Sequence, residues 1–256
     1  MLSTVTSLNG FAIEATDGPL GTVSDFLFDD QTWKVRWLVV DTGTWLPGRK
    51  VLLHVSALGK ADPLNQLLPV SLTKQQVENS PDILEHQPVS QQMQGRLYDY
   101  YGWDPYWGGN FLGMGSIASP VGGAVMDAPG SDAAVAEIAQ GIDQNADPHL
   151  HSVDAVTGYN IHATDGAIGH IEDFIVEDVD WTVRYLIADT RNWLPGQHVL
   201  LSPYAVTDIE WLDRHVQVNL SREKIKAGPP WDPVNLVDEA YVERLHQHYD
   251  WPGYPR

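Results

Sequence analysis

The sequence predicts a mainly β protein: two tandem small β-barrels, each with a short helix and an aromatic-rich C-terminal tail, joined by a Gly/Ala-rich linker. Three observations predict this fold: a long internal repeat, short apolar segments separated by turn residues, and a helix start signal after the last segment of each copy. The expected boundaries are 1–106 for the first barrel and its tail, 107–151 for the linker, and 152–256 for the second barrel and its tail.

The internal repeat is long and regular. Residues 10–53 and 158–201 align without a gap, and 23 of their 44 positions are identical. The offset of 148 residues (158 against 10) continues into the tails, where Trp103 matches Trp251. Chance does not maintain one register over such a length. The chain is therefore an internal duplication, and the repeated unit is a barrel plus a tail.

Turn chemistry separates the predicted strands. Each copy carries ATDG followed by a further glycine, and the Asp-Gly pair favours the positive-φ turn of a β-hairpin. Each copy also carries WLPG, in which proline presets φ and glycine accepts the left-handed conformation. The residues expected to shape these turns are Asp17, Gly18, Gly21, Asp41, Pro47 and Gly48 in the first copy and Asp165, Gly166, Gly169, Asp189, Pro195 and Gly196 in the second.

The segments between the turns have the composition of strands. Residues 35–40 are β-branched and apolar, which is typical of a central strand, and two more strands are expected at 51–53 and near 68–72. Thr73 is a helix N-cap, and Ser221 takes its place in the second copy. Five or six short strands that end in one helical turn favour a small barrel, because closure removes exposed strand edges.

Four motifs follow one another up to Pro81: L-x-G, DG-x-x-G-x-V-x-D-x-L-F-D, V-R-x-L-V-V-D-T-G-x-W-L-x-G-R-x-V-L-L, and V-x-L-T-x-x-Q-V-x-x-S-P. This run resembles the PRC-barrel domain family, the module of the cytoplasmic part of the reaction-centre H subunit and of the C-terminal part of the ribosome-maturation factor. The second copy is similar, but Gly43 becomes Arg191 and Arg49 becomes Gln197.

The resemblance implies a non-enzymatic protein-binding or scaffold protein. Because duplicated copies usually keep the surface through which their ancestors met, we expect the two barrels to pack as an intrachain pseudo-dimer, with homo-oligomerisation left open. The tryptophans of the WLPG turns either cover a barrel mouth or face a partner, and the aromatic tails either pack on a barrel or form a recognition patch. The candidate partner-binding residues are Trp45, Arg49, Trp193, Gln197, Trp103 and Trp251.

Charge and composition narrow the partner classes. The net charge of −19 repels nucleic-acid phosphates and anionic lipid headgroups, so we expect no nucleic-acid partner and no direct membrane insertion. A basic protein partner or bound cations are left open. The absence of cysteine excludes disulfides and thiolate chemistry. Residues 1–10 have no signal-peptide pattern, so we expect a cytoplasmic location. Residues 107–126 are too glycine-rich for a membrane span, and whether they pack on a barrel or touch a membrane is open.

Two alternative functions follow from particular features. The resemblance to the reaction-centre module suggests a membrane-associated accessory to photosynthetic or electron-transfer complexes. Asp41 and Asp189 each follow an apolar run and precede threonine, which suggests a remote alternative, an aspartic-type hydrolase with paired carboxylates. Arg191 stands where such a site needs glycine, so we predict no catalytic residues.

No cofactor and no metal site are predicted. The chain has ten histidines, but their spacing along the sequence matches no metal-ligand motif. Whether His and carboxylate clusters form in space, and bind a metal, is left open by the sequence.

Overall fold

The computed structural model describes two halves of the chain. The first half is residues 2–103 without 45, 47–48, 81–96 and 99, and the second half is 147–253 without 148, 191–196 and 233–236. The candidate partner-binding residues Trp45 and Trp193 therefore lie outside the described residues. The same holds for the predicted turn residues Pro47, Gly48, Pro195 and Gly196. Most of the predicted linker at 107–151 also lies outside them.

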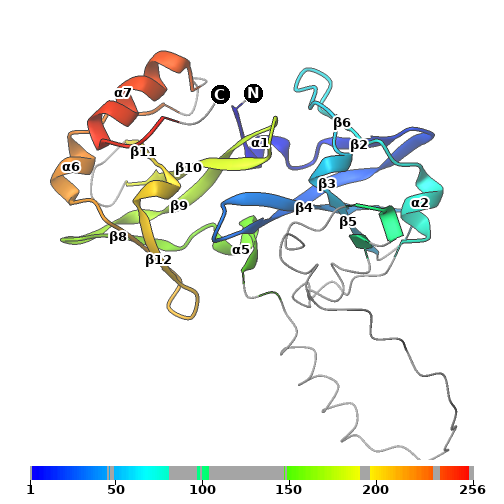
Figure 1. Ribbon diagram of the computed structural model, residues 1–256, viewed down its shortest axis with the longest axis horizontal. Helices are drawn as coiled ribbons and strands as arrows, with labels where there is room; N and C mark the ends of the chain where they lie inside the picture. The colour runs from blue at the N-terminus through cyan, green and yellow to red at the C-terminus, as the bar shows by residue number, and fades with distance from the viewer. Residues whose placement is uncertain are drawn as a thin grey trace, which may run out of the picture.

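Besides the first short strand of each half, five described strands recur in the same order in the two halves, and the second half has one more, β12 (Val206–Glu210) (Figure 1). The first half holds β2 (Ala12–Ala15), β3 (Gly18–Asp29), β4 (Lys34–Asp41), β5 (Lys50–His54) and β6 (Leu67–Pro69). The second half holds β8 (Asn160–Ala163), β9 (Gly166–Glu177), β10 (Thr182–Asp189), β11 (His198–Leu201), β12 (Val206–Glu210) and β13 (His215–Val218). In each half the long hairpin (β3–β4 or β9–β10) is flanked by a third antiparallel strand, and β2 and β8 pair in parallel with β6 and β13.

Short helices follow the last strand of each half, as the sequence predicted. Helix α2 (Lys74–Glu78) begins after Thr73, whose side chain forms a capping box with Gln76. Helix α6 (Arg222–Lys226) begins after Ser221, whose side chain accepts a hydrogen bond from the N–H of Lys224. A longer helix, α7 (Glu239–Tyr249), ends the second half.

The fold is mainly β, but the described strands form one 13-stranded mixed sheet and not two separate sheets. The halves join where β4 meets β10 at the antiparallel pair Lys34 and Thr182. The N–H of Val35 donates to the carbonyl of Trp181, and the N–H of Val183 donates to the carbonyl of Trp33, both at 2.7 Å. The hairpin ends thus satisfy each other's backbone groups, which a sequence pattern cannot reveal.

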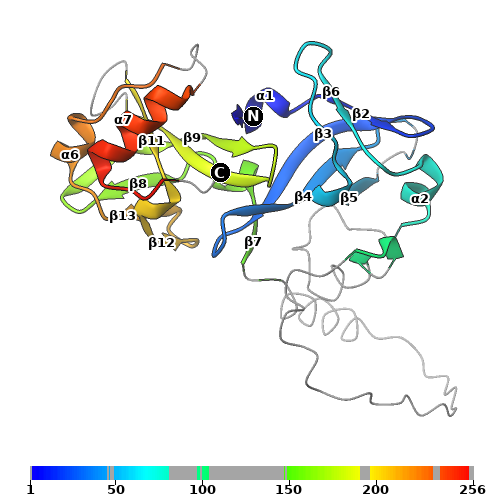
Figure 2. The ribbon, with the colours of Figure 1, turned by 45° about the horizontal axis from the view of Figure 1, so that its top comes forward.

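The halves also exchange strands. Strand β1 (Leu2–Thr4) pairs with β9 of the second half, and β7 (Leu150–Ser152) pairs with β3 of the first half. Helices α1 (Val5–Leu8) and α5 (Val153–Val156) follow these strands and pack on the same partners. In Figure 2 the N-terminal segment lies between the two halves.

Two aspartates receive the exchanged segments. Asp25 of β3 accepts hydrogen bonds from the hydroxyl of Ser152 and, at 3.2 Å, from the N–H of Asp154. Asp173 of β9 accepts from the N–H of Thr6 at 3.2 Å and 3.3 Å. Burial raises the pKa of both carboxyl groups above the ordinary value, although these hydrogen bonds act in the opposite direction.

The core continues across the junction. Phe28 packs against Phe174 with ring centroids 5.7 Å apart, and Phe26 stacks on Trp181 at 5.8 Å. Trp33 and Trp181 have φ of 56° and 52°, which is uncommon for large side chains. Two residues at matching positions thus have the same strained backbone, where each half contacts the other.

The predicted turn residues have distinct local roles. A Cβ on Gly21 or Gly169 would lie 2.1 Å or 1.9 Å from the carbonyl oxygen of Asp41 or Asp189, so the neighbouring strand leaves space only for glycine. Gly18 and Gly166 have φ of 135° and 140° in the hairpin turns. Asp17 and Asp165 accept hydrogen bonds at 2.7 Å from the first N–H of α2 and of α6, so each turn is tied to the helix of its own half.

Candidate functional site

Two predicted partner-binding residues lie just after the WLPG turns. The guanidinium of Arg49 donates to the carbonyls of Glu78, at 2.8 Å, and Ser80, so it joins the start of β5 to the end of α2. The carbonyl of Gln197 accepts from the hydroxyl of Thr190 at 2.6 Å. Within the described residues, the Arg49 side chain contacts its own half.

Trp103 and Trp251 also contact their own halves. Trp103 stacks on Tyr101 at 4.3 Å and lies beside Trp37 and His54. Trp251 stacks on Tyr249 at 4.3 Å, and it lines a pocket of about 980 Å³ between α7 and Leu2. These partly buried side chains are part of the packing of each tail on its sheet.

Asp41 and Asp189 cannot form a catalytic pair. They lie at the ends of β4 and β10, and these antiparallel strands meet at Lys34 and Thr182. Each aspartate lies seven residues beyond that pair (34 to 41, and 182 to 189), in opposite directions. At roughly 3.3 Å per residue the carboxylates lie tens of ångströms apart, whereas a shared proton needs hydrogen-bonding contact. The paired-carboxylate hydrolase is therefore wrong for Asp41 and Asp189.

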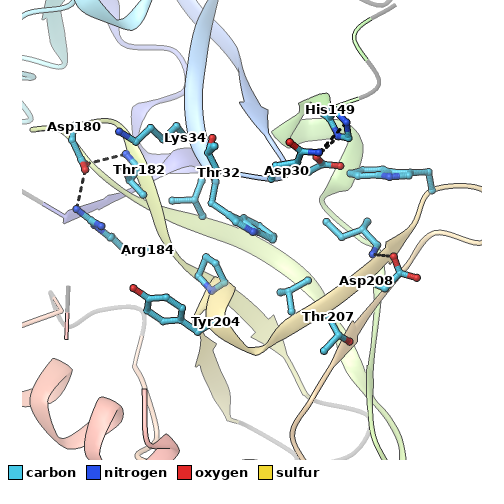
Figure 3. Close-up of a pocket in the computed structure, with 17 residues that line it drawn as sticks. Asp30, Thr32, Lys34, His149, Asp180, Thr182, Arg184, Tyr204, Thr207 and Asp208 are labelled. Atoms are coloured by element: carbon cyan, nitrogen blue, oxygen red, sulfur yellow. Dashed lines mark hydrogen bonds and ion pairs between the residues drawn. The ribbon is translucent and has the colours of Figure 1, made fainter. Parts of the chain in front are cut away.

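The halves enclose a groove of about 850 Å³ at their junction (Figure 3). We call it the interhalf groove. The first half contributes the β3–β4 turn with Trp33 and Lys34, and the second half contributes parts of β10 and β12 together with Tyr204 and Trp211. Tyr204 is 44% exposed. The groove thus offers aromatic surface to a ligand.

Strand β12 borders the groove along its edge. Val206, Thr207, Asp208 and Ile209 all line it, although successive side chains of a strand point to opposite faces. A register shift between Val206 and Asp208 interrupts this alternation, and the run of four lining residues places the groove beside the strand. Among the described strands β12 pairs with β13 alone, and it is an end of the sheet. One edge of β12 therefore faces the groove.

Three charged or titratable groups that line the groove, Asp30, His149 and Arg184, are held in ion pairs or hydrogen bonds. Arg184 donates to Glu177 at 2.7 Å through Nε and to Asp180 at 3.1 Å. His149 and His151 contact Asp30 at 2.9 Å and 3.1 Å. Burial alone would raise the pKa of Asp30, but the hydrogen bonds with the two histidines outweigh it and lower that pKa. These pairs fix the groove walls before any ligand arrives.

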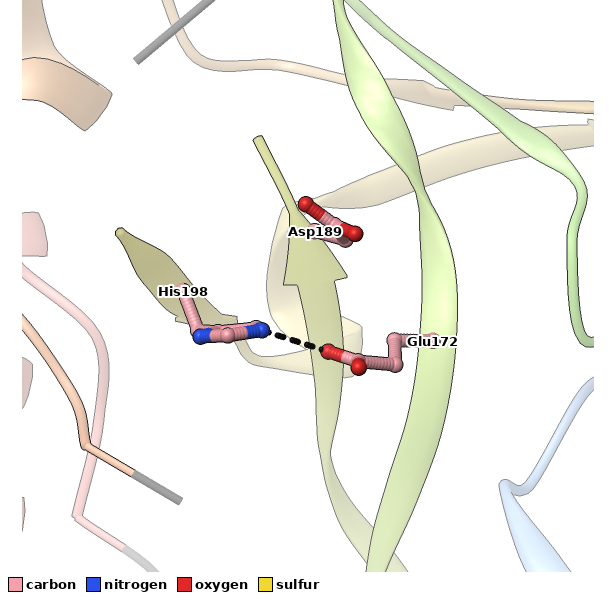
Figure 4. Close-up of side chains that lie close together, drawn as sticks. All are labelled: Glu172, Asp189 and His198. Carbon is pink, nitrogen blue, oxygen red and sulfur yellow. Dashed lines mark ion pairs between the residues drawn. The ribbon is translucent and has the colours of Figure 1, made fainter. Parts of the chain in front are cut away.

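Two clusters of His and carboxylate groups lie elsewhere in the second half. Glu172, Asp189 and His198 come from β9, β10 and β11 (Figure 4). The other cluster, Glu210, Asp213 and His215, lies in the β12–β13 hairpin. In each cluster the donor atoms lie within 4.8 Å of one another. Sequence spacing missed the first cluster because its three residues meet only through strand register.

The groove aromatics were missed for a different reason. Tyr204 and Trp211 lie outside the aligned 10–53 and 158–201 stretch, and the first copy has Ser56 and Pro63 at the matching positions. A search for aromatic residues that are present in only one copy would have identified Tyr204 and Trp211.

Comparison with known protein families identifies one domain. A PRC-barrel domain is found at residues 3–66. That range includes α1 and all of β1 except Leu2, and both elements pack on the second half. No curated protein matches the chain. Within the described part of the chain, no helix has the length and apolar character needed to cross a membrane.

Proposed function

We propose that this chain is a non-enzymatic protein-binding protein that receives an extended segment of its partner in the interhalf groove. In this proposal both copies are PRC-type barrels, and they pack as an intrachain pseudo-dimer. The observation that carries the proposal is the edge of β12, which faces a groove with exposed aromatic surface. A PRC-barrel domain at residues 3–66 supports an interaction module without catalysis.

The second copy is assigned by equivalence. Its strands, turns and cap residues recur 148 positions (158 against 10) after those of the first copy. The exchange of β1 and β7 is reciprocal, as two copies related by a pseudo-two-fold axis require. The junction that creates the groove is therefore a product of the duplication.

The groove chemistry suggests what the partner segment is like. A strand edge offers backbone N–H and C=O groups, which favour an extended segment added beside β12. Tyr204, Trp211 and Ile209 offer apolar and aromatic contacts. The chain carries a net charge of −19, which attracts a basic partner and repels an acidic one. We therefore expect an extended, apolar segment flanked by Lys or Arg.

Hydrogen exchange on the partner complex tests the position of the segment. Proteins captured by the intact chain are divided into peptides, and a binding peptide is added to the purified chain. We expect slower amide exchange in Val206–Glu210, because a paired strand protects its N–H groups. Binding without any change of exchange in β12 would contradict strand addition.

Variants test whether the groove carries the affinity. Tyr204→Ala and Ile209→Asp should weaken the peptide by about 10-fold or more, since each removes or opposes an apolar contact. The matched controls are Ser56→Ala and Ala61→Asp at the equivalent positions of the first copy, and these should bind as the parent does. Equal losses of peptide affinity in the groove variants and in the controls would show that the binding site is not the groove.

A further inference from the structure

We propose that Glu172, Asp189 and His198 bind one divalent metal ion of the zinc class, with His170 as a fourth ligand. This site lies apart from the interhalf groove, which none of the four residues lines. The proposal therefore stands or fails independently of the proposed partner binding.

Strand register brings the four side chains to one face of the sheet. Asp189 of β10 lies directly opposite His198 of β11 and directly opposite His170 of β9. Directly opposed residues of antiparallel strands project to the same side. Glu172 lies two residues from His170, and the buried Ile171 between them points inward. Three adjacent strands thus present four ligand side chains side by side.

A β-bulge sets the position of Glu172. Asp173 pairs with Ile187 and Ile171 pairs with Ala188, so Glu172 is the extra residue of β9. Bulges re-aim side chains, and they are frequent beside functional sites. Here the bulge brings the carboxylate of Glu172 to 2.8 Å from Nε2 of His198, as Figure 4 shows.

The donor distances fit a small ion. Tetrahedral zinc bound at about 2.0–2.2 Å requires donor atoms roughly 3.3 Å apart. The contact of 2.8 Å between Glu172 and His198 and the 3.9 Å between His170 Nε2 and Asp189 Oδ2 lie on either side of that value. His170 lies outside the set of three whose donor atoms are all within 4.8 Å of one another, so its side chain, which is 39% exposed, must rotate to complete the site. The Glu172 side chain is 42% exposed and is likewise able to adjust.

The ligand chemistry fits the same class of ion. Imidazole nitrogen suits zinc and related transition metals, and two carboxylates neutralise a divalent charge. Asp189 is buried to 1% exposure, so one ligand is fixed from within the sheet. The N–H of Trp231 donates to the carbonyl of His198 at 3.2 Å and fixes the backbone of β11 beside the site.

The first copy provides an internal comparison. Thr22, Ser24, Asp41 and Lys50 occupy the positions of His170, Glu172, Asp189 and His198. Only the aspartate is shared, and the ammonium group of Lys50 replaces an imidazole ligand with a cation. The metal chemistry is therefore an acquisition of one copy, and one ion per chain is expected.

Titration of the metal-free full chain with ZnCl₂, followed by calorimetry, tests the site. We expect one ion per chain, and His198→Gln and Glu172→Gln should each weaken binding by about 10-fold or more. His215→Gln, in the exposed hairpin cluster, is the matched control and should keep the parent affinity. Melting of each metal-free variant checks that the fold is intact, and zinc should raise the melting temperature of the parent but not of His198→Gln.

A second probe keeps the test decisive if one variant folds poorly. Co²⁺ bound to the parent should give visible absorption bands of a four-coordinate site, and zinc should displace them. Two results would overturn the proposal: absence of zinc binding by the parent, or binding that survives both His198→Gln and Glu172→Gln but is lost in His215→Gln.

Discussion

The two halves of this chain share their backbone devices but differ in the chemistry they display. Gly21 and Gly169 allow the same close approach of two strands, and Asp17 and Asp165 accept from the first N–H of equivalent helices, α2 and α6. In contrast, the cluster around Asp189 has only its aspartate in common with the first copy, and the groove residues Tyr204 and Trp211 have no aromatic counterparts there. After the duplication, both copies have thus kept the glycines and aspartates that shape the backbone, whereas the side chains of the cluster and of the groove have diverged.

The residues around the two tails also share their backbone positions but differ in side-chain chemistry. In the first half, Trp37 packs edge to face with His54 and Tyr98, and these two rings are tilted against each other, with centroids 5.0–5.3 Å apart. At the equivalent place in the second half, the hydroxyl of Tyr185 and Nε2 of His246 form a hydrogen bond of 2.8 Å. The same backbone position is therefore stabilised by aromatic packing in one copy and by a polar pair in the other.

The largest expected effect comes from substituting the glycines that allow two strands to approach closely in both halves. Gly21→Ala and Gly169→Ala should each destabilise the chain by at least roughly 3 kcal/mol, because the new methyl group would overlap the carbonyl oxygen of Asp41 or Asp189. Urea denaturation measures the loss. Gly158→Ala is the control: its Cβ meets nothing within 4 Å, so only backbone strain of about 1 kcal/mol is expected. Similar values for Gly158→Ala and Gly169→Ala would contradict the steric argument.

The hydrogen bonds that hold the two exchanged segments should contribute slightly different free energies of unfolding. Asp25→Ala removes the acceptor for both Ser152 and Asp154 and should cost about 2–3 kcal/mol. Asp173→Ala removes the acceptor for one residue of the exchanged segment, Thr6, and should cost about 1–2 kcal/mol. Both substitutions also remove the acceptor for the N–H of the following phenylalanine, so that loss is common to the two variants. Chemical denaturation of both variants gives the difference. A larger loss for Asp173→Ala would show that the hydrogen bonds do not determine how tightly each exchanged segment is held.

The sequence predicts what is local and repeated. Asp17-Gly18, Gly21 and Thr73 identify turns, a close approach and a helix start, because their chemistry acts on neighbouring backbone. The exchange of β1 and β7 is different, since a strand of three residues does not specify which of two similar hairpins it joins. The metal-ligand cluster likewise exists only once three strands are in register.

The pH dependence of stability should distinguish the two tails. Burial, with Arg36 nearby, lowers the pKa of His54 from 6.5 to about 4. The unfolded chain therefore binds more protons between these values, so stability that is complete above pH 6.5 is lost as the pH falls toward 4. The loss should be roughly 2 kcal/mol after allowance for the remaining solvent exposure of the ring.

His54→Asn provides the comparison for this pH effect. The equivalent residue of the second half is Ser202, which does not titrate in this range. Burial also lowers the pKa of His246, although its hydrogen bond with Pro252 opposes the shift, so the variant should keep a smaller pH slope. Thermal melts from pH 7 to pH 4 measure both slopes. If the dependence of melting temperature on pH were unchanged in His54→Asn, His54 would not be the cause of the pH effect.

The smallest expected effect concerns a difference between the copies that lies beside the turns. Arg49→Gln gives the first half the residue of the second, and it removes the hydrogen bonds to the carbonyls of Glu78 and Ser80. We expect a loss of about 1 kcal/mol, because these carbonyls can turn to water instead. Gln197→Arg is the reciprocal change, and it should shift stability by less than about 0.5 kcal/mol, since the second half folds without that link. A stabilisation by Gln197→Arg as large as the destabilisation by Arg49→Gln would contradict this expectation. It would mean that an arginine at position 197 binds the end of α6 as Arg49 binds the end of α2.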